Sequence, residues 1–338
     1  MEFLRRIFGS SKSEQAVAGT TTGVPETQVD TAPLPREEVE RANEIFGADP
    51  VPKENTPKSD EEAVVPLQTR PLAPPEEFKS SNHVIRYGVS THKGRVRTNN
   101  QDSTLTFFSN LTSANEPPPI GLFVVADGMG GHHDGERASE LTVQTLAQVV
   151  LNEIIQPQMM EIENTAELRT IPEVLTEAMT SAHDNVKAQV PDGGTTATCA
   201  VIRGDLAYIA HVGDSRAYLV NGDTMELITR DHSLVQRLIE LGQLTEEEAE
   251  VHPQRNVLYR ALGQGDTIEP DTSMRRLPPA SRLLLCSDGL WSVIGDQKIK
   301  EILEKHPDPQ EACDLLIDEA NQNGGPDNIS AVLIQMPK

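Results

Sequence analysis

One apolar run, Leu122-Phe123-Val124-Val125-Ala126, places the strongest constraint on how this chain folds. The run is short, β-branched and aromatic, which predicts a strand buried on both faces. It ends at a carboxylate, Asp127, and three glycines follow within four residues before a helical pattern starts near Glu136. Glycine adopts positive φ and lets a backbone carbonyl approach a ligand closely. The stretch is compatible with a metal site and equally with an ordinary strand-to-helix turn.

A second apolar run, residues 283–286, leads through Ser287 to another Asp-Gly pair, Asp288-Gly289. Further aspartates stand at predicted strand ends or tight turns, flanked by small residues: Asp102, Asp214 and Asp327. A set of carboxylates without paired cysteines or histidines suits oxygen-preferring cations, so Mg²⁺ or Mn²⁺ fits better than Zn²⁺. Two such ions about 4 Å apart would lower the pKa of a bridging water and stabilise an in-line displacement at phosphorus. Arg97 is the candidate to hold the phosphate, because a guanidinium grips two phosphate oxygens at once.

The charge balance and the cysteines exclude several classes of protein. The chain has 29 Lys+Arg against 52 Asp+Glu, a net charge of -23, which argues against nucleic acid and against an anionic membrane surface as partners. Cys199, Cys286 and Cys313 are far apart and odd in number, which indicates reduced thiols in a cytoplasmic protein. Cys199 and Cys286 lie inside apolar runs, which predicts that these two are buried. No apolar run approaches the roughly 20 residues that cross a bilayer. The N-terminus has no signal-peptide core, so we expect no transmembrane segment.

The first 80 residues differ in composition from the rest. They contain ten of the 24 prolines and few apolar clusters, which predicts a disordered, acidic, Pro-rich tail before a globular domain over residues 81–338. Apolar residues at helical spacing surround two arginines in residues 1–8, so residues 1–10 are a candidate element that docks on a partner or a membrane. A frayed terminus is the alternative. A Pro start and a Gly stop predict a short helix over residues 35–47.

The globular part alternates blocks of strands with pairs of helices. The predicted strands cover residues 84–90, 105–108, 121–127, 195–203, 206–212, 216–220, 226–229, 282–287 and 329–335. The predicted helices cover residues 136–155, 172–189, 234–241, 245–251, 296–305 and 309–322. Consecutive strands followed by helices favour antiparallel sheets with helices outside over a βαβ alternation, which makes the fold class α+β.

Seven blocks of the sequence match, in order, the motifs of a known family. They are Gly94-Arg95-Val96-Arg97-Thr98-Asn99-Asn100-Gln101-Asp102, Val125-Ala126-Asp127-Gly128-Met129-Gly130-Gly131-His132, Gly194-Thr195-Thr196-Ala197, Val212-Gly213-Asp214-Ser215-Arg216-Ala217-Tyr218-Leu219, Thr229-Arg230-Asp231-His232-Ser233-Leu234-Val235, Cys286-Ser287-Asp288-Gly289-Leu290-Trp291 and Gly324-Gly325-Pro326-Asp327-Asn328-Ile329. Each block alone is a weak signal, but their order is highly specific. Over residues 84–336 the chain resembles the metal-dependent protein phosphatases of the protein phosphatase 2C family, in their bacterial form.

The resemblance implies a four-layer α-β-β-α sandwich and an enzyme that hydrolyses phosphoserine and phosphothreonine in proteins. A hydroxide bridging two metal ions would attack the phosphorus, while Arg97 holds the phosphate. The implied catalytic residues are Arg97, Asp127 and Asp288. The implied metal ligands are Asp127 as the bridge, the Gly128 carbonyl at the first ion, Asp288 and Asp327 at the second, Asp214 at a third, and Asp102 through metal-bound water. Residues 231–263 resemble the mobile flap that influences how members of the family handle substrates.

Two positions depart from the family pattern. Gln101 stands where many members have Glu, which removes a second acid there. Met129 stands where eukaryotic members carry a histidine proposed as the general acid. The general acid therefore stays unassigned, and a metal-bound water or a group on the flap would have to protonate the leaving oxygen.

The expected partners are phosphorylated proteins, namely serine/threonine kinases and their substrates, and the expected oligomeric state is a monomer. One alternative is a non-catalytic relative that binds phosphoproteins. Such a relative would be marked by loss of Asp127, Asp288 or Arg97, and this chain has all three. A second alternative keeps the chemistry but acts on a partner-switching regulator, and the sequence does not separate it from action on kinase substrates.

Overall fold

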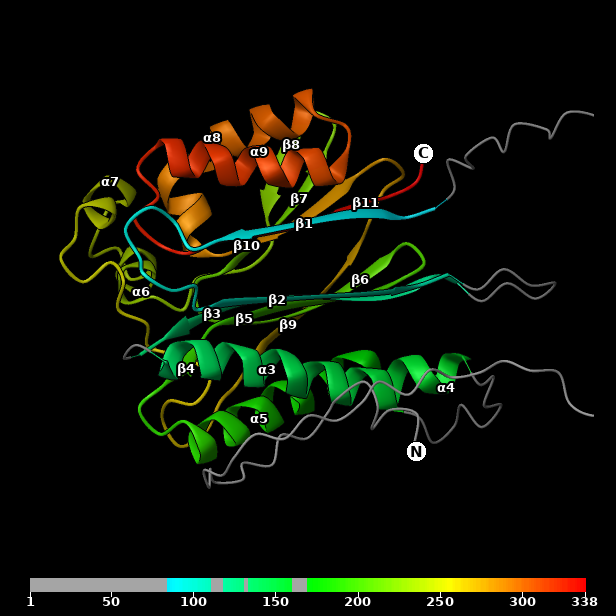
Figure 1. The fold of residues 1–338 in the computed structure, drawn as a ribbon, viewed down its shortest axis with the longest axis horizontal. Coiled ribbons are helices and arrows are strands. Elements are labelled where there is room, and N and C mark those ends of the chain that lie inside the picture. Colours follow the sequence, from blue (N-terminus) through cyan, green and yellow to red (C-terminus); the bar gives the residue numbers. More distant parts are fainter. Residues whose placement is uncertain (1–83, 111–117, 131–132, 160–168) are drawn as a thin grey trace, which may run out of the picture. The chain divides into compact units, whose positions relative to one another are not determined.

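The computed structural model describes residues 84–110, 118–130, 133–159 and 169–338 (Figure 1). The chain divides into two units, Met1–Leu72 and Ala73–Lys338, and every described residue belongs to the second. The predictions for the tail, including the docking element and the short helix over residues 35–47, lie outside the described residues. Within the described ranges, no helix has the length and apolar character that crossing a membrane requires.

Two antiparallel sheets form the centre of the second unit. The first contains, in spatial order, β1 (Arg86–His92), β11 (Ile329–Gln335), β10 (Arg282–Cys286), β7 (Arg216–Asn221) and β8 (Thr224–Leu227). The second contains β2 (Asp102–Ser109), β3 (Ile120–Met129), β5 (Ala197–Arg203), β6 (Leu206–Val212) and β9 (Asp271–Arg276), and the short β4 (Gly194–Thr195) pairs with the end of β3. The central strands β3, β5, β10 and β11 are the most apolar runs of the sequence.

Helices cover the outer face of each sheet (Figure 1). On the second sheet lie α3 (Asp134–Val150), which runs on through the π-helical segment η1 (Leu151–Ile155) into α4 (Gln156–Met159), and α5 (Ile171–Gln189). On the first sheet lie α8 (Asp288–Lys305) and α9 (Pro309–Gln322). Asp308 caps α9 by accepting hydrogen bonds from the backbone N–H groups of Gln310 and Glu311. The α+β prediction of two antiparallel sheets with helices outside is confirmed.

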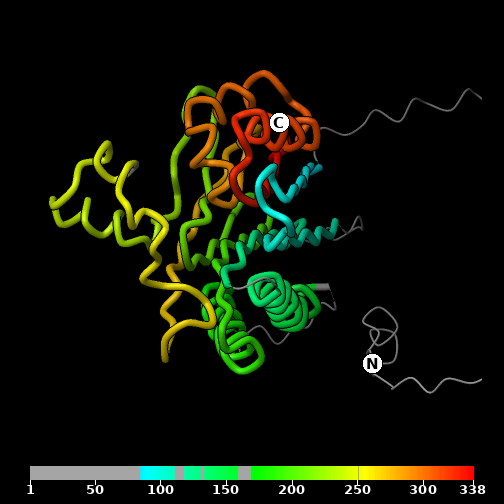
Figure 2. Tube along the Cα trace, turned by 60° about the vertical axis from the view of Figure 1, so that its left-hand side comes forward, coloured from blue at the N-terminus to red at the C-terminus, as the bar shows by residue number. Residues whose placement is uncertain are grey.

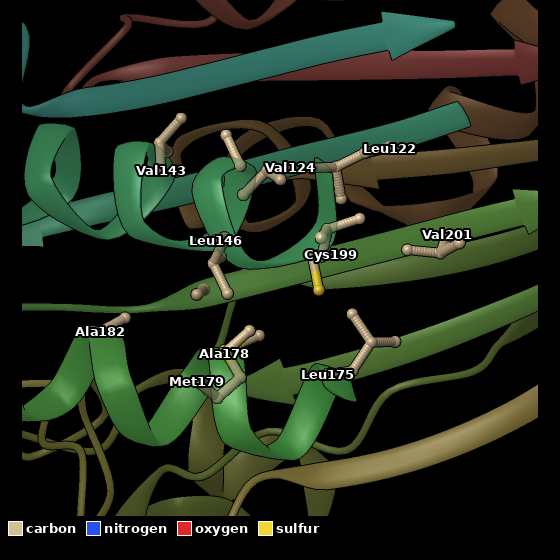
Figure 3. Packing of buried hydrophobic residues seen from close by; sticks show 14 of the residues in the cluster. Leu122, Val124, Val143, Leu146, Leu175, Ala178, Met179, Ala182, Cys199 and Val201 are labelled. Atoms are coloured by element: carbon tan, nitrogen blue, oxygen red, sulfur yellow. The ribbon is translucent and has the colours of Figure 1, made fainter. Parts of the chain in front are cut away.

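Alternate side chains of β3 face different parts of the core, which explains why the run is apolar without interruption. Leu122 and Val124 pack in the cluster that α3 and α5 cover (Figure 3). Phe123 and Val125 pack in the cluster between the two sheets, with Leu285 of the first sheet. These four side chains of β3, and Leu285, are fully buried. One face of β3 therefore sets the separation of the second sheet from its helices. The other face sets its separation from the first sheet.

Several elements differ from the sequence prediction. The strand β9 was not predicted, because its sequence, Asp-Thr-Ser-Met-Arg-Arg, has no apolar face; it pairs with β6 at the edge of the sheet. The helix α8 begins at Asp288, whereas the predicted helix began at residue 296. Gly295 adopts φ 71° and divides α8 into two helical pieces, and the prediction covered only the second piece. The strand β8 begins and ends two residues earlier than the predicted range 226–229.

The segment predicted as a flap, residues 231–263, projects from one end of the sandwich (Figure 2). It contains α6 (Leu234–Glu240) and α7 (Glu246–Glu250), and α6 has no buried residue. Both of its ends are fixed by backbone hydrogen bonds. At one end the His232 N–H donates to the Gly213 carbonyl at 2.7 Å, and at the other Leu262 and Thr195 exchange two bonds of 3.1 and 2.8 Å.

Candidate active site

The five predicted aspartates come together from both sheets. Asp102 opens β2, Asp127 lies near the end of β3, Asp214 lies in the turn between β6 and β7, Asp288 opens α8, and Asp327 lies just before β11. The carboxylate of Asp127 interacts electrostatically with the four others. Residues that are up to 225 positions apart in the sequence therefore form one group of acids.

Hydrogen bonds to its main chain hold Asp127 in place. Its N–H donates to the Thr196 hydroxyl at 3.0 Å, and its carbonyl accepts from the Thr196 N–H and the Thr195 hydroxyl, both at 2.8 Å. The register of β2 and β3 places Asp102 directly opposite Asp127. These contacts fix the backbone from which both carboxylates extend.

Gly128 has no room for a side chain. A Cβ there would lie 2.1 Å from the carbonyl oxygen of Gly135 and 2.7 Å from that of Gln101. The Gly128 N–H donates to the same Gln101 carbonyl at 3.1 Å. The backbone of this residue therefore packs directly against neighbouring backbone, and only glycine fits there.

The hydroxyl of Ser287 links the two sheets beside the acids. It donates to Asp102 Oδ2 at 2.7 Å and accepts from the Ser330 N–H at 2.9 Å. Ser287 is also the N-cap residue of α8, so it immediately precedes Asp288. One buried hydroxyl thus connects Asp102 of the second sheet to Ser330 of the first, immediately before Asp288.

Arg97 and Asp327 form an ion pair between two loops, with Nη2 2.7 Å from Oδ2. The other carboxylate oxygen of Asp327 accepts from the Asn328 N–H at 2.8 Å. The side-chain amide of Asn328 donates to the carbonyls of Lys93 and Asn99, at 3.0 and 2.9 Å. Asn328 therefore positions the loop that presents Arg97 relative to Asp327.

Asp214 follows Gly213, whose φ of 110° makes the tight turn between the strands. The Asp214 carbonyl accepts from the indole N–H of Trp291 at 3.0 Å. The guanidinium of Arg216 lies 3.5 Å from the centre of the Trp291 ring and pairs with buried Asp231 at 2.9 Å. This stack connects the Asp214 turn to the first turns of α8 and to the start of the flap segment.

Burial and mutual repulsion disfavour charge on these acids. Burial raises the pKa of Asp102 to about 7 and that of Asp288 to about 6, and neighbouring carboxylates add to both shifts. The same two causes hold the pKa of Asp127 and Asp214 well above their usual range. The hydrogen bond to Asp327 raises the pKa of the Arg97 guanidinium. A divalent cation would offset this concentration of negative charge.

The donor atoms fit oxygen-preferring divalent cations. Buried oxygens Asp102 Oδ1 and Asp288 Oδ1 have no hydrogen-bond partner, which is costly unless a cation or a proton compensates them. In the part of the chain that the structure describes, no group of three or more acidic, histidine or cysteine side chains already has the arrangement that holds a metal ion. In this arrangement Asp327 is directed to Arg97 and Asp102 to Ser287.

Comparison with known families identifies the domain. Residues 87–329 match the model of protein phosphatase 2C. The chain belongs to the protein phosphatase 2C family. The matched range contains Arg97, Gly128 and all five aspartates of the site. The prediction of a phosphatase of this family is confirmed.

Relatives within the protein phosphatase 2C family cover most of the chain. The serine/threonine phosphatase stp of Listeria innocua serovar 6a is 37% identical over 245 residues, which is 72% of this chain and 93% of the relative. The solved structure of the S. agalactiae serine/threonine phosphatase has a TM-score of 0.63 and 32% identity, and covers 75% of this chain and 100% of that one. The catalytic domain of the phosphatase PstP, solved in complex with two manganese ions, has a TM-score of 0.57 and 32% identity, and covers 74% and 97%.

The charged residues predicted for the site lie together in the structure, but sequence reasoning missed the groups that position them. These are the hydroxyls of Thr195, Thr196 and Ser287, the amide of Asn328 and the indole of Trp291. Each stands within one of the seven matched blocks, next to or near a site glycine or aspartate. Their positions within the matched blocks could have marked them as site residues. Their roles, however, depend on contacts between strands that are distant in the sequence.

Proposed function

We propose that this chain hydrolyses phosphoserine and phosphothreonine in proteins with the help of divalent cations, Mg²⁺ or Mn²⁺, held by the aspartate cluster. The observation that carries the proposal is the meeting of Asp102 and Asp127 from one sheet with Asp288 and Asp327 from the other. Such a group of carboxylates costs folding free energy unless cations bind it. The PstP relative with two manganese ions supports the same cofactor class.

Membership of the protein phosphatase 2C family supports the ligand roles that we propose here. Asp127, with the Gly128 carbonyl, Asp288 and Asp327 would hold two ions. Asp214 would hold a third ion, and Asp102 would act through water. When bound, the ions supply activation of the attacking water and stabilisation of the charge on the phosphoryl oxygens.

The chain's own residues would bind and orient the substrate. The Arg97 guanidinium is half exposed and only one of its nitrogens is engaged by Asp327, so its remaining donors can hold two phosphate oxygens. The pKa of the guanidinium is raised, so the group stays cationic through the pH range of the reaction.

A covalent cysteine intermediate is disfavoured by the state of the thiols. All three cysteines are buried, and burial raises the pKa of Cys199 and Cys313 to about 12 and that of Cys286 further. A thiol with such a pKa carries almost no thiolate at neutral pH, and the thiolate is the nucleophile. Direct attack by water on phosphorus is therefore the step we propose.

The test is hydrolysis of a phosphothreonine peptide with Mn²⁺, with and without chelator, by the wild type, Asp288→Asn and Asp318→Asn. Asp318 is an exposed residue of α9 and serves as the matched control. We expect the chelator and Asp288→Asn each to remove most activity, with Asp318→Asn unchanged. Equal turnover in chelator would overturn the proposal.

Residues 1–10 lie outside the described residues, and their docking on a partner or a membrane remains a separate proposal. Deleting them should change localisation or partner capture in cells and leave peptide hydrolysis unchanged. An unchanged set of captured partners would contradict it. Cytoplasmic location and a monomeric state are likewise proposed, and fractionation and sedimentation test them.

A further inference from the structure

The loop that carries Arg97 is fixed by its main chain. Residues 93–97 connect β1 towards β2 beside the acids. The N–H groups of Arg95 and Val96 both donate to the Gly325 carbonyl, at 2.7 and 3.3 Å. The Lys93 carbonyl accepts from the Asn328 amide at 3.0 Å. The backbone of this loop is thereby tied to the loop that carries Asp327.

Gly94 shows how close that attachment is. It adopts φ +80°, and a Cβ would lie 2.1 Å from the Asp327 carbonyl oxygen and 2.7 Å from that of Gly325. Its N–H donates to His92 Nδ1 at 2.9 Å. The two loops therefore pack backbone against backbone, and the side chains on either side of Gly94 extend from a fixed base.

The side chains of this loop are exposed although their backbone is fixed. Lys93, Arg95 and Val96 are all exposed, Val96 to 70%. Within the described ranges, neither Lys93 nor Arg95 forms an ion pair or a side-chain hydrogen bond, whereas Arg97 on the same loop pairs with Asp327. Two unpaired cations and one exposed apolar side chain thus precede Arg97, the residue proposed to hold the phosphate. These cations stand out in a chain whose net charge is -23.

We propose that Lys93, Arg95 and Val96 form a second subsite, which binds the residues next to the phosphorylated residue of a protein substrate and favours a negatively charged group there. The proposal rests on the proposed phosphatase function. The ligand chemistry is an anionic oxygen group, either the carboxylate of an acidic residue or a second phosphate, with an apolar neighbour packing on Val96. A phosphopeptide with basic neighbours would be disfavoured.

The fixed backbone is what makes the surface selective. Because residues 93–97 are already held by Gly325 and Asn328, binding costs little ordering of the loop. Each exposed ion pair contributes only modestly, and salt screens it. Two pairs together predict a preference of about 3- to 10-fold in KM, which weakens as ionic strength rises.

The experiment compares peptides with one phosphothreonine and neutral, acidic or basic neighbours, and one peptide with a second phosphothreonine nearby. p-Nitrophenyl phosphate serves as a substrate without neighbours. The variants are the double substitution Lys93→Ala with Arg95→Ala, and Arg203→Ala as the matched control. Arg203 is exposed at the far end of β5 and, among the described residues, also has no side-chain partner.

We expect the wild type to show the lowest KM for the acidic or doubly phosphorylated peptides. The double variant should lose that preference to less than about 2-fold, with kcat and p-nitrophenyl phosphate hydrolysis unchanged, and Arg203→Ala should keep it. A preference for the doubly phosphorylated peptide alone would assign the subsite to phosphate, and a preference for both peptides would assign it to anionic oxygen groups in general.

The failures are distinguishable. Hydrolysis of every peptide with the same KM, or a preference that survives in the double variant, would overturn the subsite and leave the phosphatase proposal intact. Wild-type protein that hydrolyses p-nitrophenyl phosphate but no phosphopeptide would overturn both. An equal rise in KM for p-nitrophenyl phosphate in the double variant would show that the two side chains act on the reacting phosphate itself, which also overturns the subsite.

Discussion

Asp127 extends from β3, a strand that is almost entirely buried, whereas the flap segment beside the site contains a helix, α6, with no buried residue. In β3 the residues leading to Asp127 are fully buried. In the flap segment, Leu241 is 54% exposed and Val251 is 78% exposed. Burial holds Asp127 within the core, whereas the flap segment exposes large apolar side chains and has no buried residue in α6.

The two regions are nevertheless joined at specific points. His232, at the first end of the flap segment, accepts the Gly213 N–H on its Nδ1 at 3.1 Å and donates its own N–H to the Gly213 carbonyl. Leu262, at the other end, pairs with Thr195, whose hydroxyl holds the Asp127 carbonyl. The ends of the flap segment therefore contact the residues that position two of the five aspartates. An exposed segment is thus attached to the buried site at both of its ends by hydrogen bonds.

The largest effect is expected for Asp127→Asn in the buried region. The amide keeps the shape of the side chain but removes the charge at the centre of the acid cluster, so kcat should fall by at least about 10³-fold. Steady-state hydrolysis of a phosphothreonine peptide with Mn²⁺ measures this. Activity within 10-fold of the wild type would place the centre of the site elsewhere.

The same substitution should raise the stability of the metal-free protein, because the folded state no longer contains one of the repelling acids. The pKa values of the acids are raised by folding, from an ordinary 3.8 to about 6 for Asp288 and about 7 for Asp102. The folded state therefore binds these protons more tightly, and the acids lower stability as pH rises from about 4 through about 7. The advantage of Asp127→Asn over the wild type should grow across that window, to a melting temperature at least about 3 °C higher at pH 7.5. A constant difference from pH 4 to 7.5 would contradict this reasoning.

A smaller loss is expected for Ser287→Ala. Removal of the hydroxyl leaves Asp102 Oδ2 and the Ser330 N–H with one partner fewer, which should lower the free energy of unfolding by about 1–3 kcal/mol. We expect kcat to fall by about 10-fold, because Asp102 loses the contact that directs it. Ser109→Ala, at the other end of β2, is the control, and chemical denaturation with steady-state kinetics measures both. Equal effects of the two substitutions would show that the bridge between the sheets does not position the acid.

The smallest effect is expected in the flap segment. Leu241→Ala should change the free energy of unfolding by less than about 0.5 kcal/mol, because the side chain is exposed. The buried Leu284→Ala, in the first sheet, should cost about 2–5 kcal/mol. Denaturant titrations compare the two. A cost for Leu241→Ala near that of Leu284→Ala would mean that the flap segment is packed as tightly as the core.

The sequence predicted the buried strands and helices well, but it predicted some of their boundaries and most of the polar contacts of the site poorly. The strands β6 and β11 and the helix α9 have the predicted bounds, because each is an apolar or capped run with a clear end. The edge strand β9 has no such pattern, and its pairing with β6 depends on the neighbouring strand. The acids were predicted because five aspartates at strand ends or tight turns, flanked by small residues, are an unusual pattern. Ser287 and Asn328 were missed because serine and asparagine are common in turns, and only the folded chain shows what their side chains contact.

The central claim is that aspartates from two sheets form one site for divalent cations, and the most direct test is thermal unfolding of the metal-free protein at pH 7.5 as Mn²⁺ is added. Binding to the folded state stabilises it in proportion to the logarithm of the cation concentration. We expect the melting temperature of the wild type and of Asp318→Asn to rise by several degrees, and that of Asp127→Asn to rise far less. Equal shifts in the wild type and Asp127→Asn, or no shift in the wild type, would contradict the account.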